Sequence, residues 1–132
     1  MAGETNLGTL LASMTPELHR GEYVFCTVPS LDGLPIHQLV AFFTEKEGIT
    51  IIISKALANT LQLQYTFVAA WITLTIHSSL EAVGLTAAFA KVLSAANISC
   101  NVVAAYYHDH IFVPVKDADR AMELLHSLAA AQ

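Results

Sequence analysis

Short apolar runs alternate with polar turns and amphipathic stretches along the chain, most clearly in its second half. An apolar run at 71–76 ends at the polar residues 77–79 and is followed by a helical pattern. A further apolar segment covers 100–107, a turn is predicted at 108–110, and the apolar segment 111–115 precedes a last helix. Runs of this length are typical of strands. The order strand, helix, strand, strand, helix builds half of a ferredoxin-like sheet in an α+β fold.

The helix between the first two of these strands has an apolar stripe at helical spacing. The stripe consists of Leu85, Phe89, Val92 and Ala96. Ser78 and Glu81 fit a capping box, in which the two side chains satisfy free amides of the first turn. Gly84 is a poor helix residue and costs about 1 kcal/mol relative to alanine. The helix therefore begins either at the capping box or near Leu85, or Gly84 lets another group approach the backbone.

The first half repeats much of this order. Residues 41–53 form a pattern of strand, polar turn and strand that matches 103–115. The segment 23–28 likewise matches 71–76. The matches indicate a duplication, although two unrelated strand-rich halves would give a similar pattern.

The two halves differ where the second half has its first helix. The first half has Pro29–Pro35 there, and these residues favour a loop. We therefore predict two ferredoxin-like units in tandem, residues 1–66 and 67–132, the first with a reduced first helix.

The N-terminal segment allows two interpretations. Four apolar residues have the spacing of a short helix, which Pro16 would end or restart. They are Leu7, Leu10, Leu11 and Met14. The segment could instead supply an edge strand, because the second half has no fourth strand after Leu128.

Composition limits the classes of partner. The chain has 132 residues, of which 55% are hydrophobic and 13% charged, and its net charge is −5. Ordinary domains have about 25% charged residues. Because this chain has far fewer, it is expected to bury apolar surface in a homo-oligomer. Nucleic-acid binding is not expected, because Lys and Arg are few and never adjacent. We expect no membrane span, because no apolar run reaches about 20 residues, and no signal peptide, because no basic segment precedes an apolar block at the start of the chain. Cys26 and Cys100 are far apart and are expected to be reduced, in the cytoplasm.

The polar corner between the strand at 71–76 and the following helix is a candidate ligand site. Gly84, Leu85 and Thr86 offer backbone amides and a hydroxyl near a helix N-terminus, which suits a carboxylate. Asn101, early in the next strand, could contact an amino group. Together these groups could hold a zwitterion without any catalytic residue, although a structural turn with a capping threonine would give the same pattern.

Two other clusters suggest catalysis only weakly. His108, Asp109 and His110 are residue types that bind zinc, and alternate residues of a strand share a face. A metal site needs three or four ligands, however, and a polar turn explains these residues equally well. His77 and Ser78 are a base and a hydroxyl side by side, but a helix start explains Ser78 and no nucleophile motif surrounds it.

Four segments resemble small bacterial proteins made of two ACT-like domains: 22–28, 70–74, 77–90 and 106–115. The paired arrangement is also similar to the regulatory regions of aspartate kinases and to cytosolic arginine sensors. The resemblance implies a βαββαβ unit used twice, with amino-acid binding at an interface between units and no catalysis. The ligand-binding positions that it implies are Val83, Gly84, Leu85, Thr86, Asn101 and Val102.

Two departures from the family pattern concern the ligand loop. The family loop has Pro before its glycine, whereas here Val83 precedes Gly84. The first half has no matching glycine before a helix, so at most one intact site per chain is expected.

The sequence therefore predicts a non-catalytic regulatory module without a metal or cofactor. It would bind a small ligand, an amino acid in class, and signal its occupancy to a protein partner that the sequence does not name. Two alternatives remain: a metal-dependent enzyme that uses His108, Asp109 and His110, and an interaction scaffold without a ligand.

Overall fold

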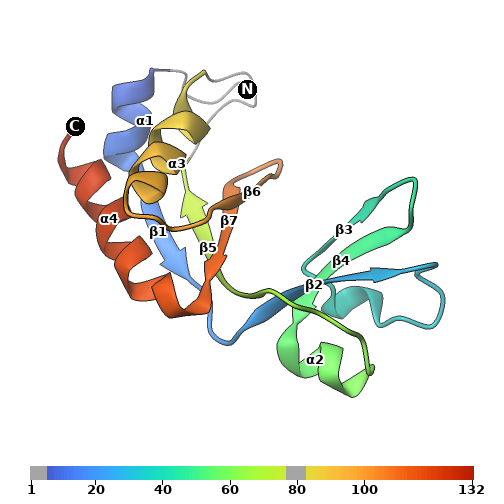
Figure 1. The fold of residues 1–132 in the computed structure, drawn as a ribbon. Coiled ribbons are helices and arrows are strands. Elements are labelled where there is room, and N and C mark those ends of the chain that lie inside the picture. Colours follow the sequence, from blue (N-terminus) through green and yellow to red (C-terminus); the bar gives the residue numbers. More distant parts are fainter. Residues whose placement is uncertain (1–5, 77–82) are drawn as a thin grey trace. The chain divides into compact units, whose positions relative to one another are not determined.

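The computed structural model describes residues 6–76 and 83–132, and the chain folds into two compact units (Figure 1). The middle unit consists of residues 20–69. The composite unit is built from both ends of the chain, residues up to His19 and residues from Ala70 onward.

The composite unit is a four-stranded sheet with helices packed on one face. Its strands lie in the order β1-β5-β7-β6, with β1 antiparallel to β5 and β6 antiparallel to β7. Its elements are α1 (Leu7–Ser13), β1 (Thr15–Leu18), β5 (Val68–Thr75), α3 (Leu85–Ala95), β6 (Asn101–Ala104), β7 (Asp109–Pro114), the 3-10 helix η2 (Val115–Asp117) and α4 (Ala118–Ala130). This strand order is that of a ferredoxin-like unit whose fourth strand comes from the N-terminal segment.

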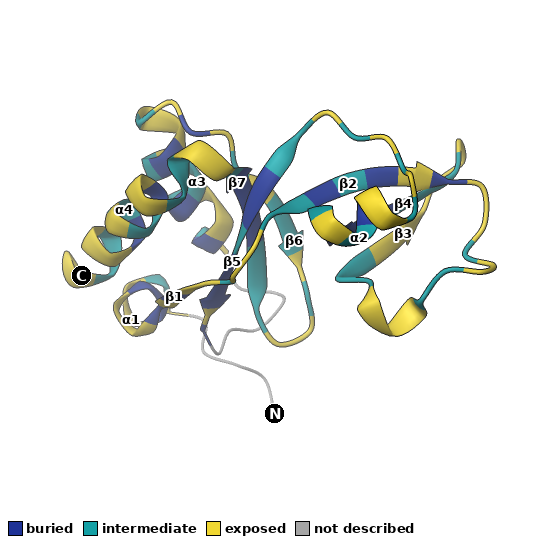
Figure 2. Cartoon of the chain, turned by 90° about the horizontal axis from the view of Figure 1, so that it is seen from below, coloured by how far each residue is buried: buried dark blue, intermediate teal, exposed yellow. Residues whose placement is uncertain are grey.

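The core of the composite unit lies between this sheet and the three helices. Side chains from α1, β5, α3, β7 and α4 form one buried cluster, which includes Leu10, Ile72, Phe89, Ile111 and Leu125. Helices α3 and α4 carry both buried and exposed residues, as amphipathic helices do (Figure 2). Over 6–76 and 83–132, none of the helices is long and apolar enough to cross a bilayer.

Both interpretations of the N-terminal segment are confirmed, because it forms first a short helix and then an edge strand. Helix α1 begins after Asn6, whose side chain accepts a hydrogen bond from the Thr9 amide at 2.9 Å. Strand β1 then pairs with β5, and its Pro16 lies opposite Leu74. Proline is tolerated there because β1 is an edge strand, where a ladder hydrogen bond can be missing.

The pairing of β1 with β5 also changes the division of the chain. The linear division at 66/67 assigns the first residues to the first domain, whereas the structure groups residues up to His19 with the second half. The reason is long-range: Thr15 lies opposite Thr75, and Leu10, Leu11 and Met14 are buried in the composite core.

The middle unit has the same strand order with one helix reduced. Its elements are β2 (Tyr23–Val28), the 3-10 helix η1 (Ile36–Gln38), β3 (Ala41–Thr44), β4 (Ile49–Ser54) and α2 (Lys55–Thr60). The order is β3-β4-β2-β5, because the first residues of β5, Val68 and Ala69, pair with β2. Leu31, Leu34 and Leu39 from the loop around η1 pack against the core of this unit. The prediction of a reduced first helix is thus confirmed.

The hairpin of the composite unit turns earlier than predicted. The segment 100–107 was expected to be a strand, but β6 ends at Ala104 and the Ala105 amide donates to the His108 carbonyl at 3.1 Å. Tyr106 and Tyr107 therefore lie in the turn, and their side chains are 79% and 74% exposed. The prediction of a strand as far as residue 107 was wrong.

Candidate functional site

The predicted ligand corner lies at the start of α3. Gly84 is the N-cap residue and has φ +92°, a left-handed conformation that favours glycine. A Cβ atom at this position would lie 3.3 Å from Cδ2 of Leu7, so glycine also allows α1 to approach closely. Helix α3 therefore begins at Leu85, one of the two starts that the sequence allowed. The predicted capping box, Ser78 and Glu81, lies outside the described residues.

The residues around Gly84 leave the first turn of α3 accessible. Val83 is 84% exposed and Thr86 is exposed, whereas Leu85 is buried in the core. Within the described residues, no side chain caps the N-terminus of α3. The first amides of a helix have no acceptor inside the helix, and they form its positive end. This turn can therefore receive a carboxylate group.

The other two predicted ligand residues lie at the far end of α3. Asn101 and Val102 begin β6, which follows the C-terminus of α3. The helix has 11 residues and is therefore about 16 Å long. Asn101 is exposed, and its Nδ2 donates to the Phe112 carbonyl at 3.2 Å, while Val102 packs against the core. Within one composite unit, residues 83–86 are thus brought together, and a small ligand there would not reach Asn101.

His108, Asp109 and His110 lie at the start of β7. The Ile76 amide donates to His108 Nδ1 at 3.4 Å, and the Trp71 indole N–H donates to His110 Nδ1 at 3.0 Å. Burial raises the pKa of the Asp109 carboxyl, and the nearby His108 partly offsets the shift. In the described ranges, no three His, Cys, Asp or Glu side chains are grouped to hold a metal ion. The Nδ1 atoms of both histidines already accept hydrogen bonds within the unit.

An imidazole and indole cluster that the sequence analysis missed lies in the composite unit. The rings of His19 and Trp71 stack with centroids 3.5 Å apart. Thr73 Oγ1 lies 2.6 Å from His19 Nε2 and 3.0 Å from His110 Nδ1. Burial lowers the pKa of both histidines, and the charges of His108 and His19 add to the effect at His110. The alternation of Trp71 and Thr73 on one strand face was the available signal, but His19 joins them only through the pairing of β1 with β5.

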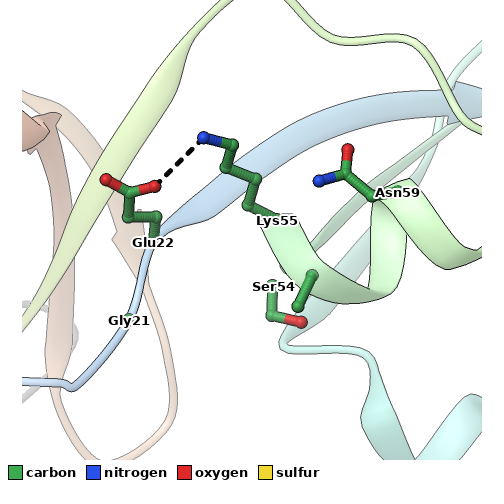
Figure 3. Close-up of a pocket in the computed structure, with 6 residues that line it drawn as sticks. Gly21, Glu22, Ser54, Lys55 and Asn59 are labelled. Carbon is green, nitrogen blue, oxygen red and sulfur yellow. Dashed lines mark hydrogen bonds and ion pairs between the residues drawn. The ribbon is translucent and has the colours of Figure 1, made fainter.

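A pocket of about 360 Å³, which the sequence did not predict, lies in the middle unit (Figure 3). It is lined by Gly21, Glu22, Ser54, Lys55, Ala56 and Asn59. Lys55 Nζ and Glu22 Oε1 form an ion pair at 3.2 Å. The antiparallel register of β2 and β4 places Tyr23 opposite Ser54, which brings these charges together from distant positions. No local motif in the sequence predicts this ion pair.

Comparison with known proteins identifies the family. Models of the ACT domain match residues 2–70 and residues 67–127. The chain belongs to the ACT domain family. It is a tandem ACT protein, as its resemblance to such proteins predicted, and no curated protein matches it.

Solved structures of three proteins illustrate the range of the similarity. A Vibrio cholerae protein of unknown function, described as a possible transport protein, is 46% identical with a TM-score of 0.83, and the match covers 93% of this chain and 95% of that one. Escherichia coli aspartokinase III in complex with aspartate and ADP is 14% identical with a TM-score of 0.63, over 86% of this chain and 33% of that one. The ligand-free regulatory subunit of Thermus thermophilus aspartate kinase is 9% identical with a TM-score of 0.62, over 88% of this chain and 98% of that one. At such low identity the two kinase matches establish the fold alone.

Membership of the family defines the broad role of this tandem ACT protein. ACT domains are regulatory rather than catalytic, and they typically bind small molecules. In the middle ACT unit, η1 follows Pro35, and no glycine N-cap is found there. Of the two ACT units, the composite one therefore has the glycine corner, at the start of α3.

Proposed function

We propose that this tandem ACT protein is a non-catalytic regulatory module that binds an amino acid at the start of α3. The supporting observation is the first turn of α3, where Gly84 takes a left-handed conformation and no described side chain caps the helix. The ligand carboxylate would accept hydrogen bonds from the first amides of α3, and the exposed Thr86 hydroxyl would add a further donor.

The amino group of the ligand needs an acceptor from elsewhere. The first turn of α3 contains no acidic residue. Asn101 is exposed on the edge strand β6 but lies too far from the same unit's α3 N-terminus. We therefore place the complete site at an interface between ACT units of a homo-oligomer, where Asn101 and Val102 of a second copy would approach residues 83–86.

This arrangement suggests how occupancy could be signalled. A ligand that bridges two units stabilises the packing in which both sets of contacts exist and shifts the population toward it. A partner protein that distinguishes the two packings would read the signal. The free Cys26 and Cys100 support a reducing compartment, the cytoplasm.

Thermal unfolding in the presence of each of the 20 amino acids tests the proposal. A ligand at 100 times its Kd stabilises the native state by about 2.7 kcal/mol, which raises the Tm by several degrees. We expect one or two amino acids to give such a rise. No rise with any of them would favour the scaffold alternative.

Variants at Val83 test the position of the site. This side chain is 84% exposed, so Val83→Asp and Val83→Lys should both fold normally. Val83→Asp places a negative charge beside the proposed carboxylate site and should abolish the ligand-induced rise in Tm, whereas Val83→Lys should retain it. An equal response of the two variants would remove the start of α3 from the proposed site.

A further inference from the structure

We infer that the pocket of the middle unit is a second ligand site, which takes a small zwitterion bearing both an ammonium and a carboxylate group. The pocket lies wholly within residues 20–69, whereas the start of α3 belongs to the composite unit. The inference therefore goes beyond the proposed function and does not depend on it.

The charges of the pocket suit a ligand with both signs. Lys55 and Glu22 share one short contact, between Nζ and Oε1, and their side chains are 39% and 40% exposed. An ammonium has three donors and a carboxylate two acceptor oxygens, so both groups retain hydrogen-bonding capacity toward the pocket (Figure 3). Their charged ends are in contact, so a ligand beside the ion pair meets both.

The same pair explains why a simple ion is a poorer ligand. An anion placed against Lys55 would also lie close to the Glu22 carboxylate, and a cation against Glu22 would lie close to the Lys55 ammonium. Like charges so placed reduce affinity. A zwitterion pairs with both groups at once and leaves neither charge unpaired.

The pocket also has the required space and neutral polar groups. Gly21 has no side chain, and Ala56 is small and exposed, so the pocket stays open beside the ion pair. A volume of about 360 Å³ lies at the small end of the range of about 300–1,000 Å³ for ligand pockets. The Ser54 hydroxyl accepts from the Leu57 amide at 3.1 Å and keeps its own proton to donate. Asn59 Oδ1 accepts from the Tyr65 hydroxyl at 2.7 Å, so its amide group is held in place.

Isothermal titration of the full chain with each of the 20 L-amino acids tests the inference, with three pocket variants. Glu22→Gln removes the partner of the ligand ammonium, and Lys55→Met removes the partner of its carboxylate. Each should weaken binding at this site by about tenfold or more, the effect of losing one charged hydrogen bond. Ala56→Leu fills the pocket, keeps both charges and should abolish binding there.

Matched controls separate this site from other effects of charge. Lys46→Met and Glu47→Gln make the same changes at exposed residues of the β3–β4 turn and should leave affinity unchanged. Val83→Asp should remove binding at the start of α3 but leave binding in this pocket unchanged, so failure of the α3 site and failure of this site are distinguishable. For the amino acid that binds, its N-acetyl and amide derivatives should bind poorly, since each lacks one charge.

The inference is overturned by either of two results. One is that no amino acid binds to the full chain. The other is that the amino acid binds Ala56→Leu and Glu22→Gln as tightly as the unmodified chain. Circular dichroism of each variant checks its fold. If a charge variant unfolds, Ala56→Leu decides the outcome, because this change leaves the ion pair intact.

Discussion

Gly84→Ala tests the structural reasoning about the ligand corner apart from any ligand. Gly84 has φ +92°, where an L side chain is strained, and its missing Cβ would lie 3.3 Å from Leu7 Cδ2. The left-handed conformation costs an alanine about 1–2 kcal/mol. Moving the flexible end of the Leu7 side chain off its preferred rotamer costs about 0.5–1.5 kcal/mol more. Alanine also makes the unfolded chain less flexible than glycine does, which offsets the loss of stability by about 0.4–1 kcal/mol. The net expected loss in the free energy of unfolding is about 0.5–3 kcal/mol.

Gly8→Ala is a matched control in the same unit. Gly8 lies within α1, and a Cβ atom there would be 3.6 Å from the nearest atom, Asn6 Oδ1, which is an ordinary contact. Alanine is the better helix residue, so Gly8→Ala should stabilise the composite unit by about 0.5–1 kcal/mol. The same chemical change should thus have opposite signs at the two glycines.

Urea unfolding followed by tryptophan fluorescence measures both effects. Trp71 is the single tryptophan of the chain, and it lies in the composite unit against His19. Adding Leu7→Ala to Gly84→Ala should remove the part of the loss that comes from the close contact, which a double-mutant cycle isolates. A Gly84→Ala variant as stable as the unmodified chain would refute the left-handed strain argument. If Gly84→Ala loses as much stability in the Leu7→Ala background as in the unmodified chain, only the argument from the Leu7 contact is refuted.

Two further predictions concern titratable groups. Burial lowers the pKa of His110 and His19, so below about pH 6.5 these two side chains bind more protons in the unfolded chain than in the folded one. Their contribution to stability should therefore be level above that pH and fall as the pH drops below it. Urea midpoints between pH 5 and 7.5 should show a weaker pH dependence in His110→Gln, whose amide oxygen can still accept from Trp71, than in the unmodified chain. Equal curves for the two proteins would contradict the argument. Burial raises the pKa of the Cys100 thiol to about 11. Iodoacetamide should therefore modify Cys100 at pH 8 far more slowly than it modifies free cysteine, because the thiolate is the reactive form. Equal rates would show that the thiol is accessible and ionised.

Local patterns in the sequence predicted much of the fold because they report periodicity and turn chemistry. Of the predicted apolar stripe, Leu85 and Phe89 are buried in the core as expected, but Leu93 rather than Val92 continues the buried face of α3. Pro29–Pro35 indeed replaces a helix. The turn between β6 and β7 was misplaced because Tyr106 and Tyr107 favour strands while His108 and Asp109 favour turns. The register that places Ala104 opposite Asp109 overrides these preferences and leaves both tyrosines in the turn.

The candidate sites were less predictable because they depend on long-range pairing. Residues 83–86 are contiguous, so the sequence alone could group them. Asn101 is close to them in sequence, but the length of α3 separates it from them in one unit. Glu22 and Lys55 meet only through the register of β2 and β4. A single sequence reports such a register poorly, since each strand is compatible with several partners.

Strand β5 explains why a linear division of this chain is difficult to place. Its first residues, Val68 and Ala69, pair with β2, while its later residues pair with β1. The same strand thus acts as the fourth strand of the middle unit and the first strand of the composite unit. The two ACT domain matches overlap at residues 67–70, which include this shared start of β5. The part of the chain after a cut at 66/67 would keep β5 but lose its edge partner β1. It would also lose Leu10, Leu11 and Met14 from the composite core. The second ACT unit is therefore complete only together with the N-terminal segment.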